Sequence, residues 1–152
     1  MLNRDFKEFA ALLNSNSVEY LLIGGYALAA HGHPRYTGDI DFWVSPERAN
    51  VDRLLHVLAV FGFGSLGLKA EDFSGDSVVQ LGRPPQRIDL LTQIDGVSFV
   101  DCWVRRQRVC VDGVELHLIG LEDFKANKRA SGRLKDLADL EALEPPEPPV
   151  SC

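Results

Sequence analysis

No apolar run in this sequence approaches the roughly 20 residues that a membrane-spanning helix needs. The first residues, MLNRDFKEFAALL, have the spacing of an amphipathic helix and lack the pattern of a signal peptide. We therefore expect a soluble, cytoplasmic protein without a membrane partner.

Cysteine is scarce as well. The three cysteines are Cys102, Cys110 and Cys152, and no two of them have CxxC spacing. An odd number without metal-ligand spacing indicates neither a disulfide framework nor a zinc site. We interpret them as the reduced thiols of a cytoplasmic protein.

Positive charge is not in excess, since the formal net charge is −6. This balance argues against a general nucleic-acid coat, although basic residues gather at 105–108 and 125–135. The 152 residues, 45% hydrophobic and 25% charged, are typical of one soluble globular domain. We predict a single domain over 1–143 and an extended, proline-rich tail over 144–152.

Hydrophobic periodicity predicts an α+β or mixed α/β domain, with a mixed sheet and helices packed mainly on one face. Strands are expected at 18–23, 40–44, 77–81, 87–91, 108–111 and 114–118. Helices are expected near 2–13, after Gly25, after a Ser45 N-cap with Pro46 in the first helical position, and at 121–130 and 134–143. The glycine-rich segment 61–67 is predicted to be a loop.

The stretch TGDIDFWV places Asp39 and Asp41 inside an apolar, strand-like segment. Residues two apart on a strand share a face, and their Cα atoms lie about 6.7 Å apart, so two carboxylates can converge on one hard cation. Such an oxygen site suits Mg²⁺. The alternative is a half-exposed strand whose outward face carries two acids.

Asp89 is a third acid between apolar residues, in the strand expected at 87–91. If this strand lies beside the one at 40–44, three carboxylates meet and predict a metal, because without a cation they would raise one another's pKa. Asp89 could hold a second metal or take a proton from an attacking hydroxyl. The alternative is an ion pair with Arg87 or Arg35.

Gly24 and Gly25 lie between an expected strand and an expected helix, where free backbone N–H groups can bind phosphate. Neither a Walker A loop nor a GxGxxG fingerprint is present, so the alternative is an ordinary turn. Arg35 and Thr37 precede the acids and could contact triphosphate oxygens.

These motifs together resemble the nucleotidyltransferase superfamily related to DNA polymerase beta, over about residues 18–143. The chain has a hydrophobic-Gly-Gly turn, 13 intervening residues, an acid-x-acid strand and a later lone acid. The resemblance implies Mg²⁺ or Mn²⁺ at Asp39, Asp41 and Asp89. It also implies that an NTP has its phosphates at Gly24 and Gly25, and that its nucleoside monophosphate passes to a hydroxyl acceptor.

The C-terminal stretch LEDFKANKRASGRLKDLADLEAL resembles a prokaryotic subgroup that includes toxin-type nucleotidyltransferases of abortive-infection and toxin–antitoxin systems. This resemblance implies that Lys128 contacts a phosphate or the nucleotide and that Asp136 is an auxiliary polar group in the active site. The residues alone also fit a lattice of charges on an exposed helix face, formed by Lys135, Asp136 and Asp139.

The acceptor is left open among a protein, a tRNA end and a small molecule such as an aminoglycoside. A different hypothesis is a nucleotidyltransferase-like binding subunit of the antitoxin type, with weak catalysis, that acts through a cognate protein. The short chain favours dependence on such a partner or on a homodimer. A third hypothesis is RNA binding through the basic cluster at 125–135, which would depend steeply on salt.

Overall fold

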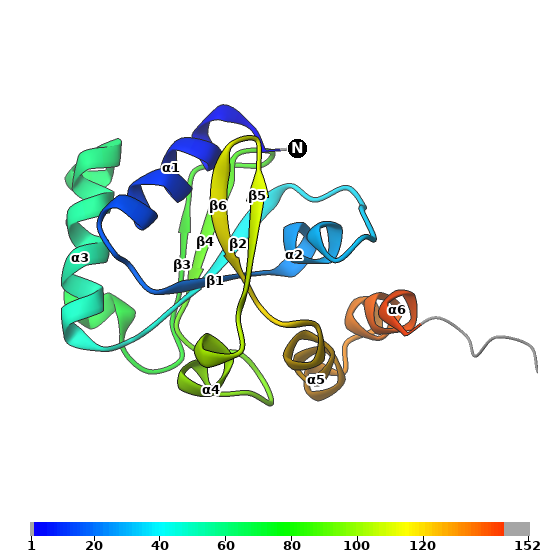
Figure 1. The fold of residues 1–152 in the computed structure, drawn as a ribbon. Helices are drawn as coiled ribbons and strands as arrows, with labels where there is room; N and C mark the ends of the chain where they lie inside the picture. The colour runs from blue at the N-terminus through cyan, green and yellow to red at the C-terminus, as the bar shows by residue number, and fades with distance from the viewer. Residues whose placement is uncertain (1, 145–152) are drawn as a thin grey trace, which may run out of the picture.

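The computed structural model describes residues 2–144, so the predicted tail lies outside the described residues apart from Glu144. A six-stranded sheet in the order β3-β4-β2-β1-β6-β5 forms its centre (Figure 1). Strand β1 pairs in parallel with β6, and β2 with β4, whereas the other neighbours are antiparallel. The strands are β1 (Tyr20–Ile23), β2 (Asp39–Val44), β3 (Val78–Leu81), β4 (Arg87–Leu91), β5 (Gln107–Val111) and β6 (Val114–Leu118). The predicted mixed α/β class is confirmed.

Two helices pack together on one side of the sheet, and α5 and α6 lie on the opposite side (Figure 1). The helices are α1 (Arg4–Ser15), α2 (Gly24–Ala30), α3 (Arg48–Leu58), α4 (Phe99–Val104), α5 (Leu121–Ser131) and α6 (Leu134–Leu143), and α1 and α3 form the first pair. Helix α1 begins where the side chain of Asn3 accepts a hydrogen bond from the Phe6 N–H, at 2.9 Å. Within residues 2–144, no helix is both long and apolar enough to cross a bilayer.

Strand β2 is buried on both faces except at its beginning. On one face, the fully buried ring of Phe42 lies 5.6 Å from that of Phe9 and 5.3 Å from that of Tyr20, between ring centroids. On the other face, Trp43 packs edge-on against Phe99 of α4, with the centroids 5.2 Å apart. The polar beginning of the strand is therefore the part of β2 that a ligand can reach.

Helix α3 begins later than the sequence predicts. Glu47 is its N-cap residue, and Ser45 lies before the helix, with its hydroxyl accepting only a 3.4 Å bond from the Glu47 N–H. The side chain of Asn50 donates to the Ser45 carbonyl at 3.0 Å and accepts from the Glu19 N–H at 2.7 Å. These bonds hold the chain at Ser45 against the start of β1, so the predicted Ser45 cap with Pro46 as first helical residue is wrong.

The segment 61–67 is not the loop that its glycines predict. Short helical turns follow α3 at Ala59–Phe63 and Gly64–Leu66, interrupted at Gly62, where φ is 112°. The ring of Phe61 packs 5.2 Å from Phe9, which holds the turns against α1. Helix α4 was not predicted, and its six residues are too few to show a helical period.

Replacement of Phe42 by Ala should lower the free energy of unfolding by about 3–5 kcal/mol, because a fully buried ring between two aromatic neighbours is removed. Chemical denaturation measures the change. Val60→Ala, at a position that is 56% exposed, is the control and should change it by less than about 0.5 kcal/mol. Similar losses in the two variants would contradict the described core.

Candidate metal centre and adjoining pocket

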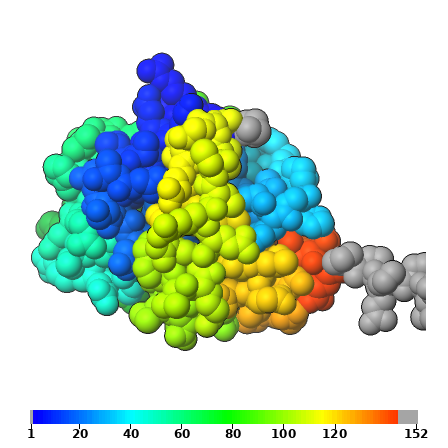
Figure 2. Space-filling model, viewed as in Figure 1, coloured from blue at the N-terminus to red at the C-terminus, as the bar shows by residue number. Residues whose placement is uncertain are grey.

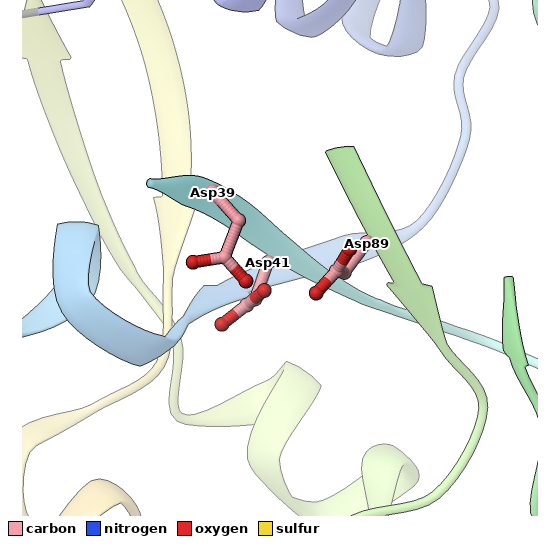
Figure 3. Close-up of side chains that lie close together, drawn as sticks. All are labelled: Asp39, Asp41 and Asp89. Atoms are coloured by element: carbon pink, nitrogen blue, oxygen red, sulfur yellow. The ribbon is translucent and has the colours of Figure 1, made fainter. Parts of the chain in front are cut away.

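Three aspartates converge on one face of the sheet. Strands β2 and β4 run in parallel with Asp41 opposite Asp89, and Asp39 lies two residues before Asp41 on the same face. One carboxylate oxygen from each aspartate lies within 4.8 Å of the other two. Figure 3 shows the side chains pointing toward one another from the two strands. The neighbouring strands on which the predicted convergence depended are therefore present.

The carboxylate of Asp41 is the least satisfied of the three. Its Oδ1 is buried and has no hydrogen-bond partner among residues 2–144. Burial, together with the charges of Asp39 and Asp89, raises the pKa of Asp41 to about 8. A buried oxygen without a partner, in a set of three carboxylates, fits the donors that Mg²⁺ and Mn²⁺ prefer.

A cation of the chain itself lies between the other two acids. The guanidinium of Arg87 donates to Asp39 Oδ2 at 2.8 Å and to Asp89 Oδ1 and Oδ2 at 2.9 and 3.0 Å. The sequence offered Arg87 as a partner of Asp89 alone. Its contact with Asp39 follows from the register, which places Arg87 opposite Asp39 in the parallel pair.

The pKa values of Asp39 and Asp89 shift in opposite directions. Burial disfavours the charged form of Asp39, but hydrogen bonds with Asp89, Asp41, Thr37 and Arg87 outweigh it and lower the pKa to about 2. Burial and the hydrogen bond with Asp39 raise the pKa of Asp89 above its ordinary value, against the effect of Arg87. Asp39 is thus ionised at neutral pH, whereas Asp89 holds a proton more readily than an ordinary aspartate.

The glycine turn leaves space for these side chains. Gly24 has φ of +72°, and a Cβ there would lie 2.1 Å from Asp41 Oδ2. A Cβ on Gly25 would lie 2.8 Å from the Cβ of Thr37, whose hydroxyl donates to Asp39 Oδ1 at 2.9 Å. Both glycines therefore allow close packing around the acids, and their predicted role in phosphate binding stays a prediction.

A second cluster of charges joins α5, α6 and the segment before β2. Lys128 donates to Asp136 Oδ1 at 3.2 Å and to Asp139 Oδ2 at 3.0 Å. Arg133 donates to Asp136 at 2.7 Å, and Arg35 binds Asp139 through two nitrogens. Lys128, Asp136 and Asp139 are all buried. The alternative of a charge lattice on an exposed face is therefore wrong for Asp136 and Asp139.

Burial alone would raise the pKa of Asp136 and Asp139, yet both values are lowered. Hydrogen bonds from Arg133 and Lys128 lower the pKa of Asp136. Hydrogen bonds from Arg35 and Lys128 lower that of Asp139. Both carboxylates are therefore charged partners of these cations, and the sequence did not reveal the part of Asp139.

A pocket of about 340 Å³ lies between the acids and the second cluster. Its lining includes Gly24, Asp41, Lys128, Arg133 and Asp136, together with apolar side chains such as Leu91 and Ile94 and polar ones such as Gln93 and Asn127. Gly25, Arg35 and Thr37 line a neighbouring hollow of about 440 Å³. The structure thus brings Asp41 of the acidic cluster, Lys128 and Asp136 to one pocket, while the roles of these residues in catalysis and nucleotide binding stay predictions.

Gly24→Ala should destabilise the protein by at least about 1 kcal/mol more than Gly67→Ala does. Both glycines have a similar positive φ, +72° and +65°, so the backbone strain is matched, but no atom lies within 4 Å of a Cβ at Gly67. The extra loss comes from the collision with Asp41. Urea denaturation of the two variants measures it, and equal losses would argue against the close approach.

Without metal, Asp41 should make the protein less stable as pH rises. Between its ordinary pKa of 3.8 and its folded pKa of about 8, the folded state keeps a proton that the unfolded state has lost. The free energy of unfolding then falls with pH by up to about 1.4 kcal/mol per pH unit from this group. Asp41→Asn removes the effect, so the free energy of unfolding of the wild type should fall relative to that of the variant between about pH 4 and pH 8 and keep a constant offset above pH 8. A constant difference across the whole range would contradict the raised pKa.

Comparison of the sequence with known protein families finds no match, and comparison with the curated proteins finds none either. In structure, the chain is similar to an antigenic nucleotidyltransferase-like protein from Paracoccidioides brasiliensis, with a TM-score of 0.52 and 17% sequence identity. The similarity covers 93% of this chain and 77% of that one. The protein thus has a nucleotidyltransferase-like fold whose acidic cluster could hold a metal ion.

Proposed function

We propose that the protein is a metal-dependent nucleotidyltransferase that moves a nucleoside monophosphate from an NTP to a hydroxyl acceptor. The observation that carries this proposal is the convergence of Asp39, Asp41 and Asp89 in a nucleotidyltransferase-like fold. The unpartnered Oδ1 of Asp41 supports a metal ligand, because a buried carboxylate oxygen without a partner is costly.

In the proposed reaction, Asp39, Asp41 and Asp89 hold Mg²⁺ or Mn²⁺. The metal would neutralise and orient the triphosphate. Asp89 is proposed to help remove the proton of the acceptor hydroxyl. The acceptor oxygen bonds to the α-phosphorus while the bond to the bridging oxygen breaks, so pyrophosphate leaves. Such a displacement depends mostly on positioning and on charge neutralisation.

Lys128 is proposed to contact a phosphate or the nucleotide from the shared pocket, with Asp136 as its auxiliary polar partner. Lys128 and Arg133 both donate to Asp136, which keeps two cations at the pocket wall. Gly24, Gly25, Arg35 and Thr37 are proposed to lie along the triphosphate. Lys128 uses two of the three N–H donors of its ammonium on Asp136 and Asp139, so one donor is left for a phosphate.

The acceptor classes that we propose are a protein, a tRNA end and a small molecule. Activity on a protein or a tRNA would fit a toxin–antitoxin or abortive-infection role. The pairing of Lys128 and Arg133 with the buried Asp136 leaves less free positive charge for RNA than the cluster at 125–135 suggests in the sequence. Steep salt dependence of RNA binding would still identify a nucleic-acid partner.

A second candidate is a binding subunit with weak catalysis that acts through a protein partner, as an antitoxin-type subunit would. The contacts of Arg87 favour it, because its guanidinium already compensates Asp39 and Asp89. An ion that binds all three acids would have to displace these bonds. The two candidates differ in whether the wild-type protein transfers label at all.

The test is incubation of the protein with each α-labelled NTP, Mg²⁺ and cell extract as the source of acceptors. We expect label in protein, tRNA or a small-molecule fraction, and a loss of about 100-fold or more in Asp39→Ala, because a metal ligand is removed. Asp52→Ala is the matched control, since Asp52 is a surface acid on α3 that pairs with Arg48.

Transfer by Asp39→Ala at the wild-type rate would remove the metal assignment. Absence of transfer by the wild-type protein, with Mn²⁺ binding intact by calorimetry, would favour the binding subunit. Label that appears in one fraction alone would identify the class of acceptor.

A further inference from the structure

Helix α6 turns its two aspartates inward and the leucines of its first half, Leu134 and Leu137, outward, while Leu143 at its end is buried. Asp136 and Asp139 are 2% and 5% exposed, whereas Leu134 on the outer face is 86% exposed. An amphipathic helix usually buries its apolar side, and a buried carboxylate is costly unless cations compensate it. The two inward aspartates therefore bind cations that apolar side chains in their place could not hold.

Asp139 binds a cation, Arg35, that belongs to the segment between α2 and β2. Arg35 donates from Nε to Oδ1 at 3.1 Å and from Nη2 to Oδ2 at 3.0 Å. Two parallel bonds of this kind fix the plane of the guanidinium as well as its distance. In Figure 2 the light-blue surface that includes this segment lies directly against the red surface of α6. Arg35 thus ties the segment to α6.

The tied segment leads directly to the metal centre. Residues 33–38 form neither helix nor strand, so side-chain contacts determine where they lie. Two residues after Arg35, the hydroxyl of Thr37 lies 2.9 Å from Asp39 Oδ1 and 3.1 Å from the Asp39 carbonyl oxygen. On its other side Thr37 packs against Gly25. The position of Thr37, and with it the orientation of the Asp39 carboxylate, depends on where the segment is held.

We propose that Asp139 is a positioning residue for the metal centre. It holds Arg35, which keeps the segment 33–38 in place, so that Thr37 orients the carboxylate of Asp39 toward the bound ion. This inference rests on the proposed metal site and adds to it a residue that lies on another element and contacts none of the three acids.

Asp136 provides a matched comparison within the same helix. It lies three residues before Asp139, is as deeply buried, and accepts from Lys128 as Asp139 does. Its other partner is Arg133 and not Arg35. Loss of either acid therefore affects Lys128 and the packing of α6, but only loss of Asp139 releases Arg35.

The experiment compares Asp139→Asn, Asp136→Asn and Arg35→Gln in the full chain. Mn²⁺ binding is measured by electron paramagnetic resonance, hydrogen exchange at residues 33–38 by mass spectrometry, and global stability by denaturation. Asp139→Asn and Arg35→Gln should each weaken Mn²⁺ binding about 10-fold, as loss of an outer-sphere partner does, and speed exchange in the segment. Asp136→Asn, which keeps the bonds between Arg35 and Asp139, should change both readouts clearly less than Asp139→Asn does.

A double-mutant cycle tests the route. Thr37→Val should weaken Mn²⁺ binding without faster exchange of the whole segment. Combined with Arg35→Gln it should cost no more than the larger single effect, because both changes interrupt one chain of contacts. Additive losses would overturn the route through Thr37.

Equal weakening by Asp139→Asn and Asp136→Asn would overturn the proposal, since it would mean that both act through Lys128 or through stability. Wild-type behaviour of Arg35→Gln in both readouts would also overturn it, and this variant keeps the pair of Asp139 with Lys128. If the wild-type protein itself binds no Mn²⁺, the proposed metal function fails, and the positioning role fails with it. Intact wild-type binding with unchanged variants would overturn the positioning role alone.

Discussion

Repulsion among Asp39, Asp41 and Asp89 is the constraint on which the rest of the site depends. The parallel pairing of β2 and β4 forces the three carboxylates together, where little water is left to screen them. Arg87 compensates two of them, and Thr37 donates to one. The third, Asp41, has neither, and its pKa rises instead. A divalent ion in this position would satisfy what the chain leaves unsatisfied.

The second cluster follows the same electrostatic rule with the signs better balanced. Two buried aspartates on α6 face three cations from α5, the α5–α6 turn and the segment before β2. Hydrogen bonds from these cations outweigh the unfavourable effect of burial on the charged carboxylates, so both aspartates stay ionised. The cluster of Asp39, Asp41 and Asp89 thus lacks positive charge, whereas the charges of the second cluster are nearly balanced. The pocket between them borders both kinds of surface, which suits a ligand that brings phosphates and a metal together.

Local sequence patterns predict the elements of this fold better than the contacts between them. The period of two along β2 predicts that Asp39 and Asp41 share a face, because side-chain direction on a strand is a local property. That Asp89 lies beside these two acids could be predicted only on the condition that its strand pairs with β2. Which strands pair, and in which register, depends on tertiary contacts that no local pattern contains. In α6 the spacing of Asp136 and Asp139 is the same whether their face of the helix is buried or exposed. The leucines at 134 and 137 suggest that the opposite face is buried, whereas both are exposed in the structure. The bond between Arg35 and Asp139 joins residues 104 apart, and no local pattern contains it.

The separation of Arg35 and Asp139 in the sequence determines when their bond can form during translation. The strand with Asp39 and Asp41 is synthesised first, and Asp89 follows before β5, β6, α5 and α6 exist. The anchor for Arg35 emerges only with α6, near the end of the described residues. A nascent chain that does not yet include α6 can therefore contain all three acids and lack Asp139, the partner of Arg35. In the proposed arrangement, the support of Asp39 therefore has to wait until α6 has been synthesised.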